Sequence, residues 1–183
     1  YFKWIISLCE KVDDYTGKKK WSEKWFLTYP SLDLFKENWA LAGESKDKDK
    51  KLVEWTNILR EQGRYYLLMD IYLYLENWEK AWDEFIHNKN QIFISNEVVN
   101  KLFRKIIKHD PARLIPVYRG LVLDNINLRK RPAYKTAAKW MKNLKEVCHL
   151  SGQDAVWATF YTQIMYEYKR FRALMEEIRT AGL

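Results

Sequence analysis

The stretch Tyr65-Tyr66-Leu67-Leu68-Met69-Asp70-Ile71-Tyr72-Leu73-Tyr74-Leu75 decides the fold of this chain. Asp70 alone interrupts a run of aromatic and aliphatic residues, so a helix over this stretch would be apolar on nearly every face. The run is shorter than the roughly 20 residues that a membrane-spanning helix needs. It therefore predicts a helix over residues 64–75 that lies at the centre of a protein core, and its length in context argues against a strand.

Apolar residues continue at helical spacing in both directions from this stretch. The clearest series is Tyr134, Ala137, Met141, Leu144 and Cys148, with steps of three and four residues. The chain has only 6 Gly and 4 Pro in 183 residues, so few positions interrupt a helix. We expect an all-α fold of about nine or ten helices without a strand.

Several helix starts can be predicted from residues that favour them. Ser31 is expected to cap one helix, and Ser95 or Asn96 to cap another, because short polar side chains accept hydrogen bonds from free N–H groups. Asp110 is expected at an N-cap, with Pro111 as the first helical residue. These signals place helix boundaries between the apolar series.

The helices do not follow a strict repeat. The 34-residue tetratricopeptide (TPR) pattern requires a conserved small residue, and Ala81 and Ala173 are the positions that match it. They lie 92 positions apart, which is not a multiple of 34. We therefore expect an irregular, TPR-like array of helical hairpins of the solenoid type, in which small residues let neighbouring helices approach closely.

The chain is expected to contain an aromatic-rich N-terminal helical segment, residues 1–45, and one continuous helical-hairpin repeat-like domain, residues 46–183. The charged residues 43–51 predict an exposed connection between them. Residues 13–17 are expected to end the first helix, and a short second helix is expected to stop at Pro30. Because the chain opens on apolar residues without Met, we expect it to be a piece of a longer protein.

Composition limits the class of protein. Lys and Arg total 32 against 24 Asp and Glu, a net charge of +8 that permits nucleic acid or another polyanion as a partner. Cys9 and Cys148 are far apart in the sequence and predict buried thiols in a reducing compartment, not a disulfide framework. We expect a cytoplasmic protein without a membrane partner, since no apolar run is long enough to span a bilayer.

The basic clusters are the only residues in this sequence that indicate a function. Phosphate groups bind such charges, and neighbouring aromatic side chains can stack on unpaired bases. Cations at helix ends also stay hydrated and offset the helix dipole, so exposed surface and polyanion binding are both open interpretations. The candidate polyanion-binding residues are Lys18, Lys19, Lys20, Arg129, Lys130, Arg131, Lys169, Arg170 and Arg172.

The sequence lacks the residue patterns that metal binding, phosphate-binding loops and catalysis require. His87, His109 and His149 each lie near an expected helix end, and none has a second ligand at a zinc-binding spacing. The glycines are isolated, so no phosphate-binding loop is predicted. We expect no catalytic, cofactor-binding or metal-binding residue and a protein that is not an enzyme.

The last part of the chain resembles a known family over residues 111–183. The residues that carry the resemblance are Arg131-Pro132-Ala133-Tyr134-Lys135-Thr136-Ala137-Ala138, Ser151-Gly152, Trp157, Lys169-Arg170-Phe171-Arg172-Ala173-Leu174-Met175-Glu176-Glu177-Ile178 and Ala181-Gly182-Leu183. This order is similar to the helical region that follows the zinc motif in bacterial SWIM zinc-finger proteins. The family's Cys-x-Cys and Cys-x-His ligands are absent here, because Cys148 and His149 are adjacent. The resemblance implies an accessory helical region of a longer protein whose finger domain would make any DNA or protein contact.

These observations favour a non-enzymatic helical scaffold or protein-interaction module. Its partner is expected to be a protein, bound in a groove that Tyr and Trp line between hairpins. The alternative is a nucleic-acid-binding module that uses the basic helix ends.

Overall fold

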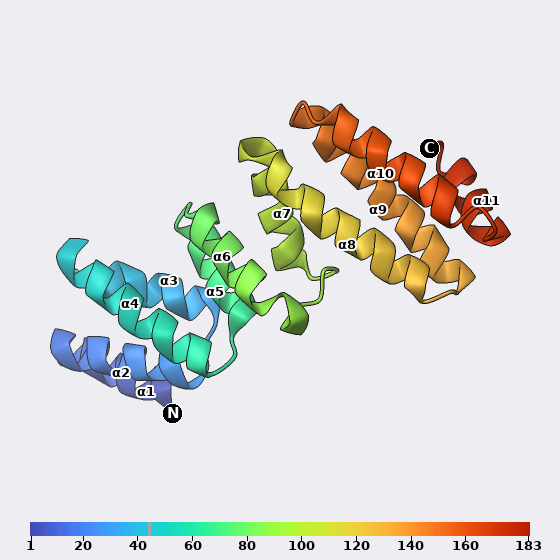
Figure 1. The fold of residues 1–183 in the computed structure, drawn as a ribbon. Coiled ribbons are helices and arrows are strands. Elements are labelled where there is room, and N and C mark those ends of the chain that lie inside the picture. The colour runs from blue at the N-terminus through green and yellow to red at the C-terminus, as the bar shows by residue number, and fades with distance from the viewer. Residues whose placement is uncertain (44) are drawn as a thin grey trace. The chain divides into compact units, whose positions relative to one another are not determined.

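The computed structural model describes residues 1–43 and 45–183, and the side chains of all of these except Ser45 and Lys46. Over these residues the chain is entirely helical and contains no strand (Figure 1). The elements in chain order are α1 (Phe2–Lys11), α2 (Tyr15–Thr28), α3 (Leu32–Leu41), α4 (Ser45–Glu61), α5 (Tyr65–Tyr74), α6 (Trp78–Asn88), the 3-10 turn η1 (Lys89–Gln91), α7 (Glu97–His109), the 3-10 turn η2 (Pro111–Arg113), α8 (Leu114–Asn127), α9 (Arg131–Leu150), α10 (Asp154–Glu167) and α11 (Arg172–Thr180).

The all-α class is confirmed, and the described residues form eleven α-helices, against the nine or ten expected. Two of the three predicted caps are also confirmed, because Ser31 Oγ accepts a hydrogen bond from the N–H of Leu34, and Asn96 Oδ1 accepts one from the N–H of Val98. Asp110 is at the N-cap position of the 3-10 turn η2 and Pro111 is its first residue, as expected. The Asp110 side chain makes no cap hydrogen bond, and its Oδ2 accepts one from Arg113 Nε at 2.9 Å.

Near the N-terminus one prediction is wrong and another is right only in part. Residues 45–51 were expected in an exposed connection, but they form the first two turns of α4. Mixed Lys and Asp at helical spacing stabilise an exposed helix, so their charge indicated exposure and not a loop. The first helix ends at Lys11, just before residues 13–17, as expected. Residues 15–17, however, already begin α2, since the side chain of Asp14 accepts a hydrogen bond from the N–H of Gly17 at 2.8 Å and caps this helix. Glu44 lies outside the described residues.

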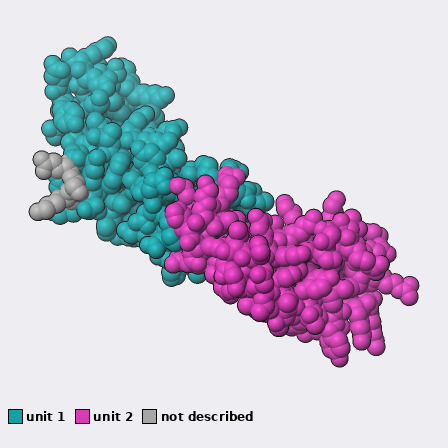
Figure 2. All heavy atoms as spheres, turned by 90° about the horizontal axis from the view of Figure 1, so that it is seen from above, with its two compact units in different colours: residues 1–102 teal, residues 103–183 magenta. Residues whose placement is uncertain are grey.

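The chain divides into two compact units, unit 1 (Tyr1–Leu102) and unit 2 (Phe103–Leu183), coloured separately in Figure 2. The predicted boundary between residues 45 and 46 stays a prediction. In unit 1, α1 packs against α2 and α5 packs against α6. The core contains three mutually contacting rings: the centroids of Phe26 and Trp55 are 5.4 Å apart, and Phe35 lies 6.0 Å from each. Leu34, Leu59, Leu68 and Ile71 complete this cluster of buried side chains.

In unit 2 the long helix α9 packs against α8, α10 and α11. Ala137 and Met141 of α9 and Ile178 of α11 are fully buried, and Phe160 of α10 is 2% exposed. The small side chain of Ala137 allows its neighbours to approach closely. Unit 2 therefore has its own core, built around one helix that presents its opposite, charged face to solvent.

Candidate functional site

The cluster Arg129, Lys130 and Arg131 forms the connection between α8 and α9. Arg129 has a left-handed backbone with φ of 50°, and its N–H donates to the carbonyl oxygen of Ile126 at 3.1 Å. Lys130 directly precedes α9 and Arg131 is its first residue. All three side chains are exposed, so this tight turn presents three cations at the N-terminal end of α9.

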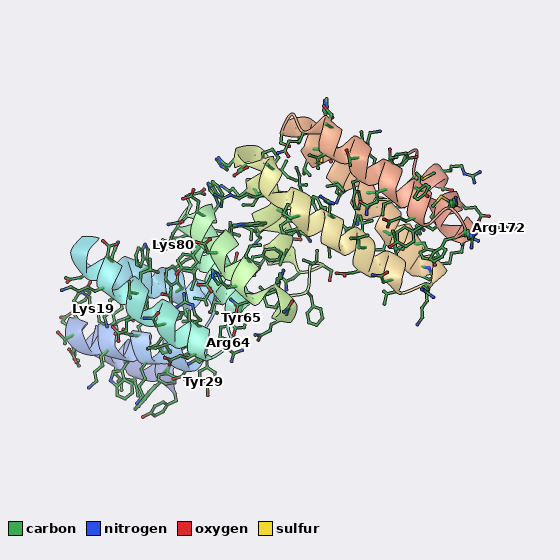
Figure 3. All side chains as sticks on the ribbon, viewed as in Figure 1. Lys19, Tyr29, Arg64, Tyr65, Lys80 and Arg172 are labelled. Carbon is green, nitrogen blue, oxygen red and sulfur yellow. The ribbon has the colours of Figure 1, made fainter. Side chains whose placement is uncertain are left out.

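The cluster Lys169, Arg170 and Arg172 lies in the turn between α10 and α11. The N–H of Phe171 donates to the carbonyl oxygen of Tyr168 at 2.8 Å, and the N–H of Arg172 donates to that of Arg170 at 3.1 Å. Arg172 is the first residue of α11 and is labelled in Figure 3. The three cations are exposed and mark the N-terminal end of α11.

The structure brings these two clusters together at one end of unit 2. The guanidinium of Arg129 lies over the ring of Phe171, 5.9 Å from its centroid. Arg131 pairs with two carboxylates of α11, Glu176 and Glu177, each at 3.0 Å. We call Arg129, Lys130, Arg131, Lys169, Arg170 and Arg172 the basic end of unit 2.

The basic end carries a surplus of positive charge. Arg131 is neutralised by its carboxylate partners, whereas the described residues place no carboxylate within ion-pair distance of the other five cations. Two helices, α9 and α11, also begin here, and the free N–H groups of a helix start carry partial positive charge. The arrangement is suited to holding an anionic group.

The cluster Lys18, Lys19 and Lys20 belongs to unit 1, in the first two turns of α2. Lys18 Nζ lies 2.7 Å from Glu10 Oε1, and this hydrogen bond raises the pKa of Lys18 above its usual value. The amine of Lys19 lies 4.7 Å from the centroid of the Tyr15 ring. Two of these three cations thus interact with neighbouring side chains, and Lys20 is exposed.

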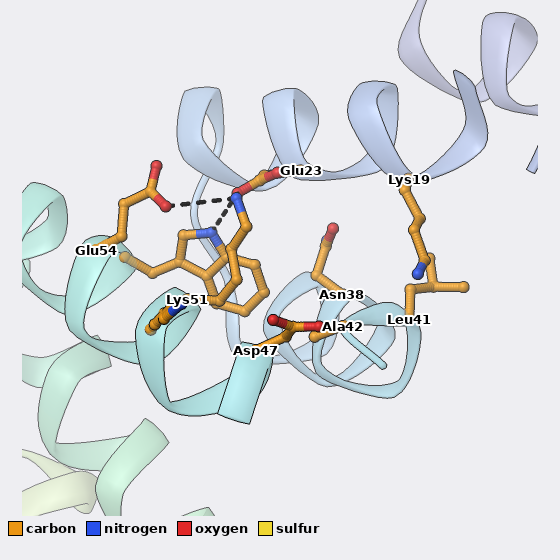
Figure 4. Close-up of a pocket in the computed structure, with 10 residues that line it drawn as sticks. Lys19, Glu23, Asn38, Leu41, Ala42, Asp47, Lys51 and Glu54 are labelled. Atoms are coloured by element: carbon orange, nitrogen blue, oxygen red, sulfur yellow. Dashed lines mark hydrogen bonds and ion pairs between the residues drawn. The ribbon is translucent and has the colours of Figure 1, made fainter. Parts of the chain in front are cut away.

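A hollow of about 400 Å³ lies beside Lys19 in unit 1, among α2, α3 and α4 (Figure 4). Six of its ten lining residues are charged, and Trp55 is the aromatic residue among them. The residues that line it are Lys19, Glu23, Asn38, Leu41, Ala42, Asp47, Lys50, Lys51, Glu54 and Trp55. It therefore differs from the groove of Tyr and Trp that we expected between hairpins.

A hydrogen-bonded cluster forms one wall of this hollow. Glu23 Oε1 accepts from Trp55 Nε1 at 2.7 Å and from Lys51 Nζ at 2.6 Å. The hydrogen bond to Glu23 raises the pKa of Lys51 above its usual value, and Glu54 adds to this effect. Both donors bind the same oxygen of Glu23, so the cluster connects α4 to α2. Holding these two helices together is a structural role for the charges of Glu23 and Lys51.

Reactive groups elsewhere are dispersed. The described residues contain no group of three or more His, Cys, Asp or Glu side chains that could hold a metal ion. His87, His109 and His149 lie in the last turns of α6, α7 and α9, as predicted. Cys9 and Cys148 are free and buried, and burial raises the pKa of the Cys148 thiol.

An exposed apolar face on α1 was not anticipated. Trp4, Leu8 and Val12 recur at helical spacing, but they are 64%, 39% and 72% exposed, and Tyr1 is 83% exposed. The opposite face of α1 packs instead, with Phe2 stacked on Trp25 at a centroid distance of 6.5 Å. Both faces have apolar residues at helical spacing, so periodicity alone did not indicate which one is buried. We call Tyr1, Trp4, Leu8 and Val12 the α1 face.

Comparisons with known proteins find one distant relative. The chain is 27% identical to the uncharacterized protein YwqB of Bacillus subtilis (strain 168), over 198 aligned positions that include all of this chain and 36% of YwqB. The chain thus spans about a third of the length of this bacterial relative. No known protein family and no solved structure matches it. Among the described residues, no helix is long and apolar enough to cross a membrane.

Proposed function

We propose that this chain is a non-enzymatic helical scaffold whose α1 face binds a protein partner. The observation that carries this proposal is the exposure of Trp4, Leu8 and Val12 on one side of the first helix. Contiguous exposed apolar side chains are typical of interaction surfaces, whereas single exposed ones are common everywhere. Trp is also the residue most enriched among those that dominate binding energy.

The α1 face indicates the kind of partner that would cover it. The exposed charges beside it are of both signs, Lys11, Asp13 and Asp14, so they favour neither an acidic nor a basic partner. We infer that the partner presents an amphipathic helix, whose apolar stripe would cover the α1 face.

A calorimetric titration tests this proposal. The probe is a synthetic peptide of about 20 residues with Leu at heptad a and d positions and Glu at the flanking ones, compared with a scrambled peptide of the same composition. Binding of the patterned peptide alone is expected. Trp4→Glu with Leu8→Glu should weaken it at least ~10-fold, which corresponds to about 1.4 kcal/mol.

Val53→Glu is the matched control, because Val53 is 60% exposed and lies outside the α1 face, on α4. Equal binding of the scrambled peptide, or equal weakening by Val53→Glu, would count against the proposal. Self-association of the chain that the α1 variants abolish would replace the helical partner by a second copy of this chain.

We also propose a wider setting: a bacterial, cytoplasmic protein in which this chain is an accessory, TPR-like, solenoid-type region beside a SWIM zinc finger. Successive packed helix pairs such as α1–α2, α5–α6 and α8–α9 support the solenoid part. The greater length of YwqB is consistent with further domains in related proteins. The coding sequence of the full protein tests the setting: a Cys-x-Cys and Cys-x-His element outside these residues is expected, and its absence would rule the setting out.

A further inference from the structure

A second hollow, of about 430 Å³, continues from the basic end of unit 2. It lies between α9 and α11 and is lined by Lys135, Lys139 and Lys142 on the first helix and by Glu177, Thr180 and Ala181 on the second, together with Thr136 and Ala138. Arg131 binds Glu177 at 3.0 Å, so the ion pair lies where the basic end meets the hollow.

The cations of α9 form a continuous row. Arg131, Lys135, Lys139 and Lys142 follow one another at steps of four, four and three residues, which places them on one side of a helix. At 1.5 Å per residue the row extends over about 16 Å. All four side chains are exposed, and Glu177, the carboxylate of the hollow, is already bound to Arg131.

The α9–α11 hollow and the basic end together are suited to binding a chain of phosphates. A linear series of cations in a groove follows a nucleic-acid backbone, and each phosphate contact releases counterions. Tyr166, 72% exposed with the amine of Lys169 5.1 Å from its ring centroid, offers an unpaired base a stacking surface at the same end.

We propose that unit 2 binds single-stranded nucleic acid along the α9–α11 hollow, with its backbone running onto the basic end. This site is separate from the α1 face of unit 1. It also assigns different roles to the basic clusters: the phosphate-binding cations among them are Arg129, Lys130, Lys169, Arg170 and Arg172, whereas Lys18–Lys20 does not bind phosphate.

Fluorescence anisotropy with a labelled oligothymidylate of about 20 nucleotides tests the proposal. For about five cations that each contact one phosphate, the logarithm of the binding constant should fall with the logarithm of the salt concentration at a slope of about −3.5. Raising the salt concentration from about 50 to 200 mM should therefore weaken binding roughly 100-fold. Lys135→Ala with Lys142→Ala should make the slope shallower by about 1.4. Tyr166→Ala should lower affinity about tenfold through lost stacking.

Lys19→Ala with Lys20→Ala is the matched control, because it removes the same charge from unit 1. It should leave affinity and slope unchanged, and circular dichroism should confirm that each variant is folded. Three results would overturn the proposal: a duplex of the same length binding as tightly, polyglutamate of equal charge binding as tightly, or the control losing as much affinity as the unit 2 variant.

Discussion

Trp55 Nε1 donates a hydrogen bond of 2.7 Å to Glu23 Oε1, from a residue 32 positions further along the chain. The indole is 2% exposed, and its ring packs edge-on against Phe26 and Phe35. A buried donor of this kind needs an acceptor, and Glu23 provides it from the rim of the core. One carboxylate therefore links the aromatic core of unit 1 to its surface.

The first prediction concerns this carboxylate. Glu23→Ala should destabilise the protein by about 1–3 kcal/mol, because it leaves the Trp55 N–H without an acceptor in a water-poor environment. Urea denaturation followed by circular dichroism measures the loss. Glu37→Ala removes an equal charge from an exposed position of α3 and should change stability by less than about 0.5 kcal/mol. Equal losses in the two variants would contradict the assigned role of Glu23.

The second prediction concerns Ala81, which is fully buried on α6. Ala81→Leu should cost about 1–3 kcal/mol, because the added side chain has no room where the helix packs against α5. A thermal melt measures this. The control is Ala40→Leu on α3, where the side chain is exposed and a good helix former should be tolerated. An unchanged melting temperature for Ala81→Leu would show that α5 and α6 pack differently.

The third prediction compares two glycines of unit 2. Gly152 has a φ of 68° just after α9, a conformation that costs a side chain about 1–2 kcal/mol, so Gly152→Ala should destabilise. Gly120 lies inside α8, and a Cβ added there would have no heavy atom within 4 Å. Gly120→Ala should stabilise by about 0.5–1 kcal/mol. Urea denaturation of both variants should give shifts of opposite sign, and shifts of the same sign would be inconsistent with these conformations.

The fourth prediction concerns alkaline pH. Burial raises the pKa of Tyr118 to about 12 from 10.0. Between these values the unfolded chain releases this proton and the folded chain retains it, so stability falls as pH rises from about 10 to 12. The effect of this residue is up to roughly 2–3 kcal/mol.

Tyr118→Phe should remove this component of the pH dependence, whatever else titrates in the same range. Denaturation midpoints on either side of the interval measure it, and spectrophotometric titration of the phenol should give an apparent pKa near the raised value. Tyr166→Phe is the control, since Tyr166 is 72% exposed. A Tyr118→Phe variant that loses as much stability with pH as the parent would exclude the assignment.

Much of the fold could be predicted because local signals agreed with tertiary packing. The run at residues 65–75 became α5, with Leu68, Met69 and Ile71 fully buried. Ser31 and Asn96 cap helices because their side chains satisfy nearby N–H groups, which needs no distant contact. The fold class and most boundaries followed from such short-range effects.

The remainder depended on contacts between distant residues. Nothing local indicated that Trp4 is exposed and Phe2 is packed, because both lie on apolar faces of α1. The meeting of Arg129 with Phe171 arises from the way α8–α9 and α10–α11 turn at the same end of unit 2, 42 residues apart in the sequence. Charge at residues 45–51 indicated exposure correctly and the backbone conformation wrongly, since Lys and Asp occur in exposed helices and in loops alike.

Exposure of Trp4 has a spectroscopic consequence. The chain has nine tryptophans, and Trp4 is the one among the described residues whose side chain is largely open to water. Its emission should lie to the red of that of buried indoles and be the first quenched by iodide. Any molecule that covers the first helix should therefore shift the intrinsic emission to the blue, so the chain carries its own optical probe of occupancy.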